Sequence, residues 1–266
     1  MPSLIIGFTA IGIYLVSSAL LFSDTLHNRS RKGVLIFAGI ATLLHCALIS
    51  QKTLHDQAFN FSFFNIASLV ACLVSILLLC AALNKPVDKL GIAIFPIAAA
   101  MLGLDLFFPE STNLIAQHFS GPMYIHILTS IIAFSLLNIA ALQAILLLIQ
   151  EQQLRNHAPK RLFLRLPPLQ TMEILLFQMI GTGVVFLSIS LGSGFIFIEN
   201  LFAQHLAHKT LLSILAWIIF SGLVYGRIRY GWRGKTAIKW TLIGFGLLLL
   251  AYFGSKLVLE LILHKT

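Results

Sequence analysis

The histidines are the residues of this chain best suited to chemistry, because imidazole binds metals and carries protons near neutral pH. The sequence has nine histidines. His45 and His126 lie inside long apolar blocks, whereas His205 and His208 stand three residues apart beside another block. An ionisable side chain inside an apolar block is costly, usually faces the interior of a helix bundle and marks a functional site. His45 and His126 are therefore the first candidates for a site.

Other patterns that indicate catalysis are absent from the sequence. It contains no Ser/His/Asp triad pattern, no HExxH motif, no phosphate-binding glycine loop and no paired-carboxylate spacing. The three cysteines, Cys46, Cys72 and Cys80, form neither Cys-x-x-Cys nor Cys-x-x-Cys-His. Neither a thioredoxin-type redox pair nor covalent haem attachment is therefore predicted. The sequence assigns the cysteines no role and predicts no disulfide, and we expect the protein not to be an enzyme.

The elements that must position the histidines follow from composition. Apolar residues make up 58% of the chain and charged residues only 10%, against about 25% charged residues in soluble proteins. This excludes a water-soluble enzyme, a disordered protein and a disulfide scaffold. The apolar blocks have the length of membrane-spanning helices, about 20 residues. We predict an all-α, polytopic membrane bundle forming one domain over residues 1–266. Its eight spans are expected at approximately residues 3–23, 33–50, 61–83, 90–108, 122–149, 174–198, 210–228 and 237–259.

The basic residues predict the orientation of these spans. Fourteen of the 18 Lys and Arg residues fall on one side of the predicted membrane and four on the other. Cytoplasmic loops carry the excess of Lys and Arg in membrane proteins, so both termini are predicted to lie on the outer side. The net charge of +9 is then explained by loops that face anionic lipid headgroups. We predict the lipid bilayer as a partner and no nucleic acid.

The predicted topology gathers histidines on the outer side, where seven of the nine are expected. At about 1.5 Å rise per residue, His45 and His126 both lie roughly 6–8 Å inside the outer boundary. Two imidazoles at matched depth on different helices would bind one metal from opposite faces, and a haem iron with two axial histidines is the obvious candidate. The alternative is that each imidazole is hydrogen-bonded to a neighbouring backbone group or Asn. The spacing leaves both open.

Three further polar residues complete the candidate site. Asp105, near the outer end of the fourth span, is placed to accept the second N–H of an imidazole, or else is a carboxylate that reaches the interface. His208 shares a helix face with His205 if this segment is helical, and otherwise is a solvated loop residue. His264 stands two residues from the end of the sequence, where chain ends fray. The small residues of the sixth span predict close helix packing; they are Gly181, Gly183, Ser188, Ser190, Gly192 and Gly194.

Several segments resemble the cytochrome c assembly superfamily, the membrane haem-handling proteins of the CcsA and CcmC type. They read PMYIHILTS at residues 122–130, YGR at 225–227 followed by GWRG at 231–234, and LAYFG at 250–254. With the PPL stretch at 167–169, the chain resembles the YpjD/HemX-like branch of that superfamily. The resemblance covers roughly residues 60–260 and extends to the number of helices.

The resemblance implies a helical bundle that binds haem b non-covalently between outer-side histidines. His126 matches the first of these histidines, and His264 falls within about a residue of the second. The embedded histidine that precedes GWRG in the family aligns with Tyr225 in this chain, so His45 is expected to replace it as an axial ligand. His126 and His45 are thus the predicted metal ligands, with His264, His208 and Asp105 as further cofactor-binding residues.

The function predicted from these observations is an inner-membrane, multi-pass bacterial protein that holds non-covalent haem near the outer face. It would assist the biogenesis of cytochromes, with haem, other cytochrome assembly proteins or an apocytochrome as partners. A small-molecule transporter is the first alternative, although inverted repeats, which are typical of transporters, are not evident. A haem-containing electron-transfer subunit is the second, and it would need a second haem site for which few histidines are left.

The charge asymmetry makes the topology directly testable. A reporter that is active only in the periplasm, fused after Thr266, is expected to be active, because the last span should end on the outer side. A reporter that is active only in the cytoplasm should be silent at the same position. The reverse pair of activities would overturn the orientation and, with it, the outer-side placement of the histidines.

Overall fold

The computed structural model of the chain is entirely helical in the part that it describes. That part comprises residues 2–27, 31–56, 62–108, 121–156, 166–197 and 207–254, and it contains no strand. Eight of its helices are long and apolar enough to cross a membrane. The predicted all-α, polytopic membrane class is thereby confirmed.

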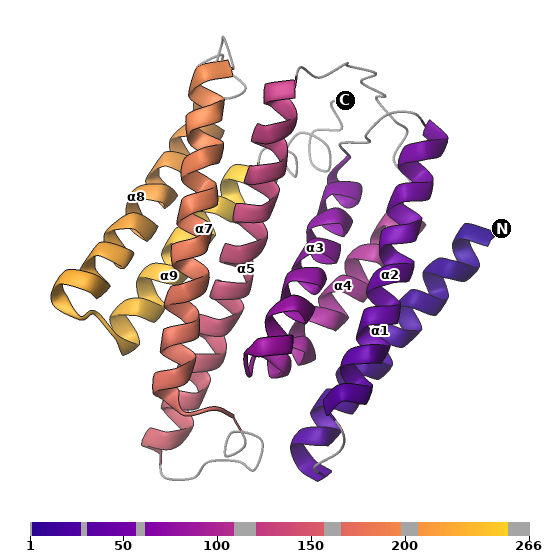
Figure 1. The fold of residues 1–266 in the computed structure, drawn as a ribbon, viewed down its shortest axis with the longest axis horizontal. Helices are drawn as coiled ribbons and strands as arrows, with labels where there is room; N and C mark the ends of the chain where they lie inside the picture. The colour runs from indigo at the N-terminus through magenta and orange to yellow at the C-terminus, as the bar shows by residue number, and fades with distance from the viewer. Residues whose placement is uncertain are drawn as a thin grey trace. The chain divides into compact units, whose positions relative to one another are not determined.

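The helices follow the predicted spans and extend beyond most of them (Figure 1). The long helices are α1 (Pro2–His27), α2 (Arg31–Asp56), α3 (Phe63–Asn84), α4 (Gly91–Phe107), α5 (Gly121–Arg155), α7 (Leu169–Phe197), α8 (Ala207–Tyr230) and α9 (Gly234–Leu249). A short 3-10 helix, η1 (Asp88–Leu90), precedes α4, and a π-helical turn, η2 (Leu250–Gly254), follows α9. The extensions consist largely of polar residues: α5 continues through QEQQLR to Arg155. Glu, Gln, Leu and Arg favour helix, so the backbone stays helical after the apolar block has ended.

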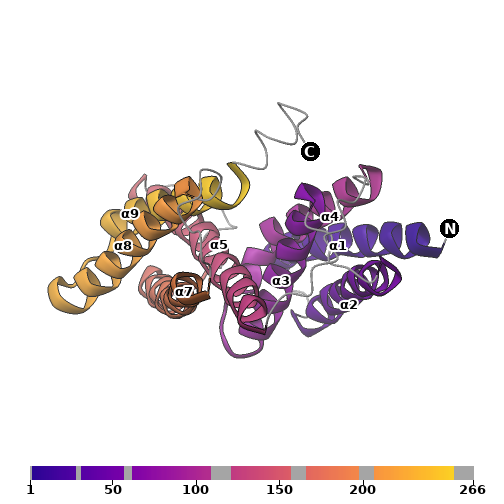
Figure 2. The same cartoon turned by 90° about the horizontal axis from the view of Figure 1, so that it is seen from above.

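The helices pack as two compact units. In the first unit, α1 and α3 each contact both α2 and α4. In the second, α5 and α8 each contact both α7 and α9. Figure 2 shows α5 beside α7 in the second unit. Each unit is therefore a four-helix arrangement in which every helix has two principal neighbours. The prediction of one domain over residues 1–266 stays a prediction, because it concerns how the units join.

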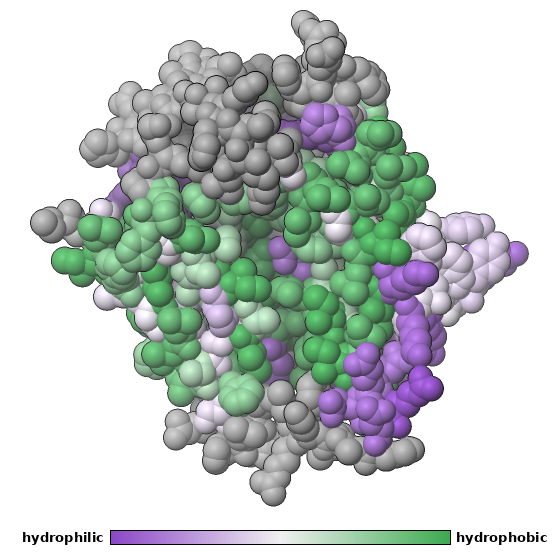
Figure 3. All heavy atoms as spheres, turned by 180° about the vertical axis from the view of Figure 1, so that it is seen from behind, coloured by the Kyte–Doolittle hydropathy of each residue, from purple (hydrophilic) through white to green (hydrophobic). Residues whose placement is uncertain are grey.

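Large apolar side chains lie on the surface of the helices. Leu43, Leu83 and Ile228 are 71%, 77% and 81% exposed, and they are only three of many. On the face shown in Figure 3, apolar residues, in green, cover most of the described surface. Such a surface is unfavourable in water but matches a lipid bilayer, which supports the membrane assignment independently of helix length.

The contact between α5 and α7 is the most extensive in the structure, and Gly183 lies at a point of close approach within it. A Cβ atom placed on Gly183 would lie 2.8 Å from the Cγ of Leu137, a side chain of α5 that is fully buried. By contrast, a Cβ on Gly181 or Gly192 would have no atom within 4 Å. The predicted packing role of the small residues is therefore confirmed at Gly183, where α5 and α7 approach closely.

Substitution of Gly183 tests this close approach. Gly183→Leu should destabilise the protein by about 1–3 kcal/mol, the usual cost of overpacking a well-packed contact. Gly181→Leu, in the same helix and two residues away, is the matched control and should have little effect. Thermal unfolding of the detergent-purified variants measures the difference. Equal loss in both variants would contradict the role assigned to Gly183.

Candidate functional site

His126 lies near the start of α5, and its ring is oriented by the backbone of α7. The Nδ1 atom is 2.8 Å from the carbonyl oxygen of Ser190. A carbonyl oxygen only accepts hydrogen bonds, so Nδ1 carries the hydrogen and donates it. In the neutral imidazole the Nε2 atom then holds a free lone pair, and among the described residues this atom has no hydrogen-bond partner. Metal-binding histidines commonly have this arrangement, donating their other ring N–H to a carbonyl.

Two hydroxyl groups reinforce the position of His126. Ser193 donates a hydrogen bond to the same Ser190 carbonyl at 2.9 Å, and its Oγ lies 3.4 Å from His126 Nδ1. Thr129 donates to the carbonyls of Ile125 and His126 at 2.7 and 3.2 Å. Sequence reasoning assigned Ser190 only to packing and missed Ser193. The signal for Ser190 was its spacing of seven residues from Gly183, which places both on the face of α7 that contacts α5.

An aromatic cluster holds α5 from its other side. Phe134, two turns after His126, has ring-centroid distances of 5.8 Å to Phe245, 4.6 Å to Tyr252 and 5.7 Å to Phe253. Tyr252 and Phe253 belong to η2 and to the LAYFG segment identified in the sequence. This segment therefore contributes packing against the helix that carries His126.

His45 lies in the first unit and is fully buried, with both ring nitrogens close to hydroxyl groups. Its Nε2 atom is 2.9 Å from Ser68 Oγ, and its Nδ1 atom is 3.4 Å from the hydroxyl oxygen of Tyr14. Tyr14 also donates to Thr42 Oγ1 at 3.2 Å, and Thr42 in turn donates to the carbonyl of Ala38. This is the hydrogen-bonded alternative that the spacing left open, with hydroxyl groups in place of backbone or Asn partners. For His45 to bind a metal, one ring nitrogen must leave its hydroxyl partner.

The other predicted site residues are not gathered around these imidazoles in the described structure. Asp105 in α4 is buried, and its Oδ2 lies 2.6 Å from the Nζ of Lys52 in α2. Its partner is thus an ammonium group, and no contact with a histidine is found in the described part of the chain. His208 is exposed in the first turn of α8. His264 lies outside the described residues, as do His118 and His205. His45 and His126 belong to different units, so their pairing on one metal stays a prediction.

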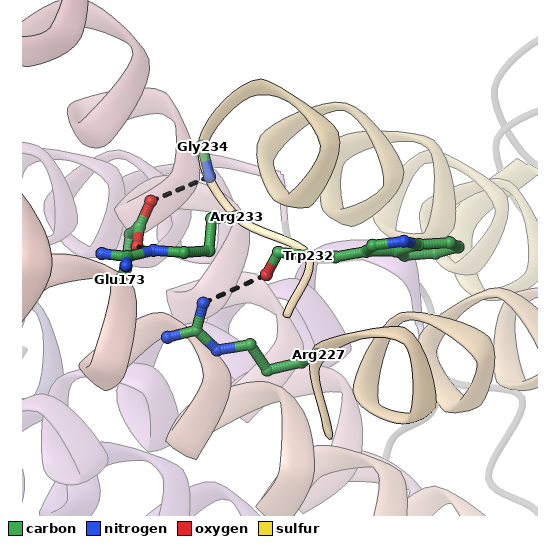
Figure 4. A network of polar contacts seen from close by, with 5 residues as sticks. All are labelled: Glu173, Arg227, Trp232, Arg233 and Gly234. Atoms are coloured by element: carbon green, nitrogen blue, oxygen red, sulfur yellow. Dashed lines mark hydrogen bonds and ion pairs between the residues drawn. The ribbon is translucent and has the colours of Figure 1, made fainter. Parts of the chain in front are cut away.

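The GWRG segment forms the turn between α8 and α9, and hydrogen bonds to side chains of α7 and α8 hold it in place (Figure 4). The carboxylate of Glu173 in α7 accepts a hydrogen bond from Arg233 Nε on one oxygen and from the backbone N–H of Gly234 on the other, both at 2.8 Å. A carboxylate at the N-terminus of α9 also interacts favourably with the helix dipole. Gly231 and Gly234 have φ values of 68° and 53°, a region that strongly favours glycine.

A second arginine closes the same turn from α8. Arg227 Nη1 donates to the carbonyl oxygen of Trp232 at 3.1 Å, and its guanidinium lies 4.8 Å from the ring centroid of Phe177. The Trp232 ring packs so closely on Gly226 that a Cβ atom at this position would clash with it. Sequence reasoning missed Glu173. The sequence feature that could have identified Glu173 is its position: it is a single carboxylate at the start of an apolar span, next to a predicted loop that is rich in arginine.

The Ser190 carbonyl that contacts His126 and the Glu173 carboxylate that contacts the GWRG turn lie toward opposite ends of α7. Glu173 and Ser190 are 17 residues apart on α7, about 25 Å at 1.5 Å per residue. The charge count predicts that the Glu173 end faces the cytoplasm and that the Ser190 end faces outward. Chemically, the arrangement offers one imidazole with a free lone pair near one end of α7 and, at the other end, a turn that carries Arg227 and Arg233.

The amino-acid sequence of the chain is similar to those of several known proteins. A family model described as cytochrome C assembly protein matches residues 34–263. The chain is 32% identical to the inner membrane protein YpjD of Escherichia coli K12, over 97% of this chain and 99% of that protein. It is 25% identical to the cytochrome c biogenesis protein CcsA of Chlamydomonas reinhardtii, over 71% of this chain and 55% of that protein. No solved structure matches the chain.

Removal of the Glu173 carboxylate tests whether this group stabilises the turn between α8 and α9. Glu173→Ala leaves the Gly234 N–H and the Arg233 guanidinium without their acceptor, which should cost about 1–3 kcal/mol. Glu151→Ala is the matched control, because this carboxylate near the end of α5 has no partner within the described residues. Thermal unfolding and trypsin cleavage after Arg233 measure the effect. Unchanged stability and unchanged cleavage in Glu173→Ala would show that the carboxylate does not hold the turn.

Proposed function

Because the chain belongs to the cytochrome c assembly protein family, we propose that it binds haem non-covalently near the outer face of the membrane and assists cytochrome assembly. It is a multi-pass inner-membrane protein. The relatives named CcsA are cytochrome c biogenesis proteins, which supports haem and an apocytochrome, or other assembly proteins, as partners. The proposed role is to bind and present haem, with no chemical conversion of the haem by this chain.

The observation that carries the proposal is the hydrogen bond from His126 Nδ1 to the Ser190 carbonyl. It fixes the tautomer in which Nε2 carries a free lone pair, and it orients the ring from the adjacent helix. The residues therefore fit one axial position of a haem iron. Haem itself would supply an iron that binds imidazole nitrogen and an apolar ring that suits the bundle. In this proposal Ser190 and Ser193 position the ligand, and the close approach at Gly183 brings the two helices together.

The second axial ligand has three candidates with different physical costs. His45, the predicted ligand, would first have to release Ser68 or Tyr14, and each such hydrogen bond contributes about 1 kcal/mol. His208 belongs to the same unit as His126 and is exposed, so it has no buried hydrogen bond to release. His264 is the position implied by the family resemblance. We keep His45 as the proposed ligand and treat His208 and His264 as its competitors.

Spectroscopy of the purified protein tests haem binding and the role of His126. The protein expressed with abundant haem should show a Soret band that shifts on reduction, with a stoichiometry near one haem per protein. His126→Ala should lose most of the bound haem or change its spectrum from low-spin to high-spin, because an axial nitrogen is removed. His55→Ala, on the same predicted side of the membrane, is the matched control and should keep the wild-type spectrum. A low-spin spectrum at full occupancy in His126→Ala would refute the assignment.

The same spectra identify the second ligand. His45→Ala should lose the low-spin signal if His45 is axial, because no second imidazole then remains on the iron. If His208→Ala or His264→Ala abolishes that signal and His45→Ala does not, the ligand pair is His126 with that residue. A low-spin spectrum that survives all three substitutions would exclude His45, His208 and His264 alike as the second ligand.

A further inference from the structure

Two cysteines that the sequence separates widely meet in the first unit. The Sγ atoms of Cys46 in α2 and Cys72 in α3 are 3.3 Å apart, and both thiols are free. A disulfide has an S–S length of about 2.05 Å, so a shift of little more than about 1 Å would bring these sulfurs to bonding distance. Cys80, in the same helix as Cys72, is exposed and takes no part in this contact.

The surroundings hold the two thiols opposite each other. Cys46 follows His45 directly in α2, and Cys72 lies one turn after Ser68 in α3. The hydrogen bond between His45 Nε2 and Ser68 Oγ, at 2.9 Å, therefore joins the two helices beside the thiols and fixes their register. Cys72 is only 3% exposed, whereas Cys46 is partly exposed. Of the two residues, Cys46 is thus the more accessible, and Cys72 is the enclosed one.

We propose that Cys46 and Cys72 form a dithiol–disulfide centre whose oxidant is a lipid-soluble quinone. In the net reaction the two S–H bonds break and one S–S bond forms. The two electrons and two protons released by the thiols pass to the quinone, which leaves as the hydroquinone. The accessible Cys46 meets the quinone first, and the enclosed Cys72 closes the bond. The other proposed haem ligand, His126, belongs to the second unit and takes no part in this centre.

Depth and charge favour a quinone over other oxidants. Cys46 lies six residues before Lys52, which ends the second span, and is therefore about 9 Å inside that boundary. Charged oxidants and the thiols of soluble proteins do not enter the hydrocarbon at this depth, whereas a lipid-soluble quinone does. An unpaired charge is also very costly there. Because a quinone accepts protons together with electrons, neutral reactants give neutral products and no net charge remains in the membrane.

Counting free thiols in the full-length protein tests the centre. Inner-membrane vesicles are reduced with dithiothreitol, freed of reductant, and incubated with decylubiquinone, whose ring is fully substituted. The protein is then denatured in detergent and labelled with maleimide-polyethylene glycol, which adds one resolvable tag to each free thiol. The wild type, with its three cysteines, should carry three tags before the quinone and one after it, without forming a dimer. Renewed reduction should restore all three.

Single substitutions assign the loss of tags to the pair. Cys80→Ser should fall from two tags to none, whereas Cys46→Ser and Cys72→Ser should keep both tags after the quinone. His126→Ala should behave as the wild type does, which separates this proposal from haem binding. Three tags on the quinone-treated wild type would overturn the proposal. Loss of tags in Cys46→Ser, or loss that dithiothreitol does not reverse, would overturn it equally.

Discussion

The hydrocarbon of a bilayer offers no hydrogen bonds, and the arrangement of these helices depends on that constraint. A polar side chain inside a span must find its partner on its own helix or on a neighbouring one. Gln143 in α5 donates to the carbonyl of Met172 in α7 at 3.2 Å. In the first unit, Ser18 of α1 donates to the carbonyl of Ile92 in α4 at 2.9 Å. Apolar packing alone permits neighbouring helices to rotate and slide, whereas bonds of this kind select one rotation and one register.

The spans were predictable from the sequence because they depend on length and apolar content alone. Contacts between spans were not, because they depend on helix rotation, which a nearly uniform apolar sequence hardly encodes. Cys46 and Cys72 illustrate this: each falls inside a predicted span, but nothing in the sequence shows that they face each other. Asp105 is a second case. Its depth in the membrane suggested an imidazole as its partner, but in the structure it pairs with Lys52, 53 positions away in the chain.

At the candidate site, too, the sequence indicated which residue matters but not which groups it contacts. That His126 is important followed from an ionisable side chain in an apolar block and from the family resemblance. Its orientation depends on a backbone carbonyl of α7, and backbone groups are the same in every sequence. The close approach of α5 and α7 at Gly183, two turns away on the same face of α7, is compatible with the short distance between His126 and the Ser190 carbonyl.

The double acceptance by Glu173 has a consequence for biogenesis. Membrane proteins are synthesised from the N-terminus, and their segments fold in the order in which they emerge. Glu173 on α7 enters the bilayer before the hairpin of α8 and α9 has left the ribosome, so for a time its carboxylate lacks both Arg233 and Gly234. The charge count predicts that the turn between α8 and α9 stays on the cytoplasmic side of the membrane. Its contacts with Glu173 join residues 60 and 61 positions apart in the chain, so they complete the second unit only after the turn has been synthesised.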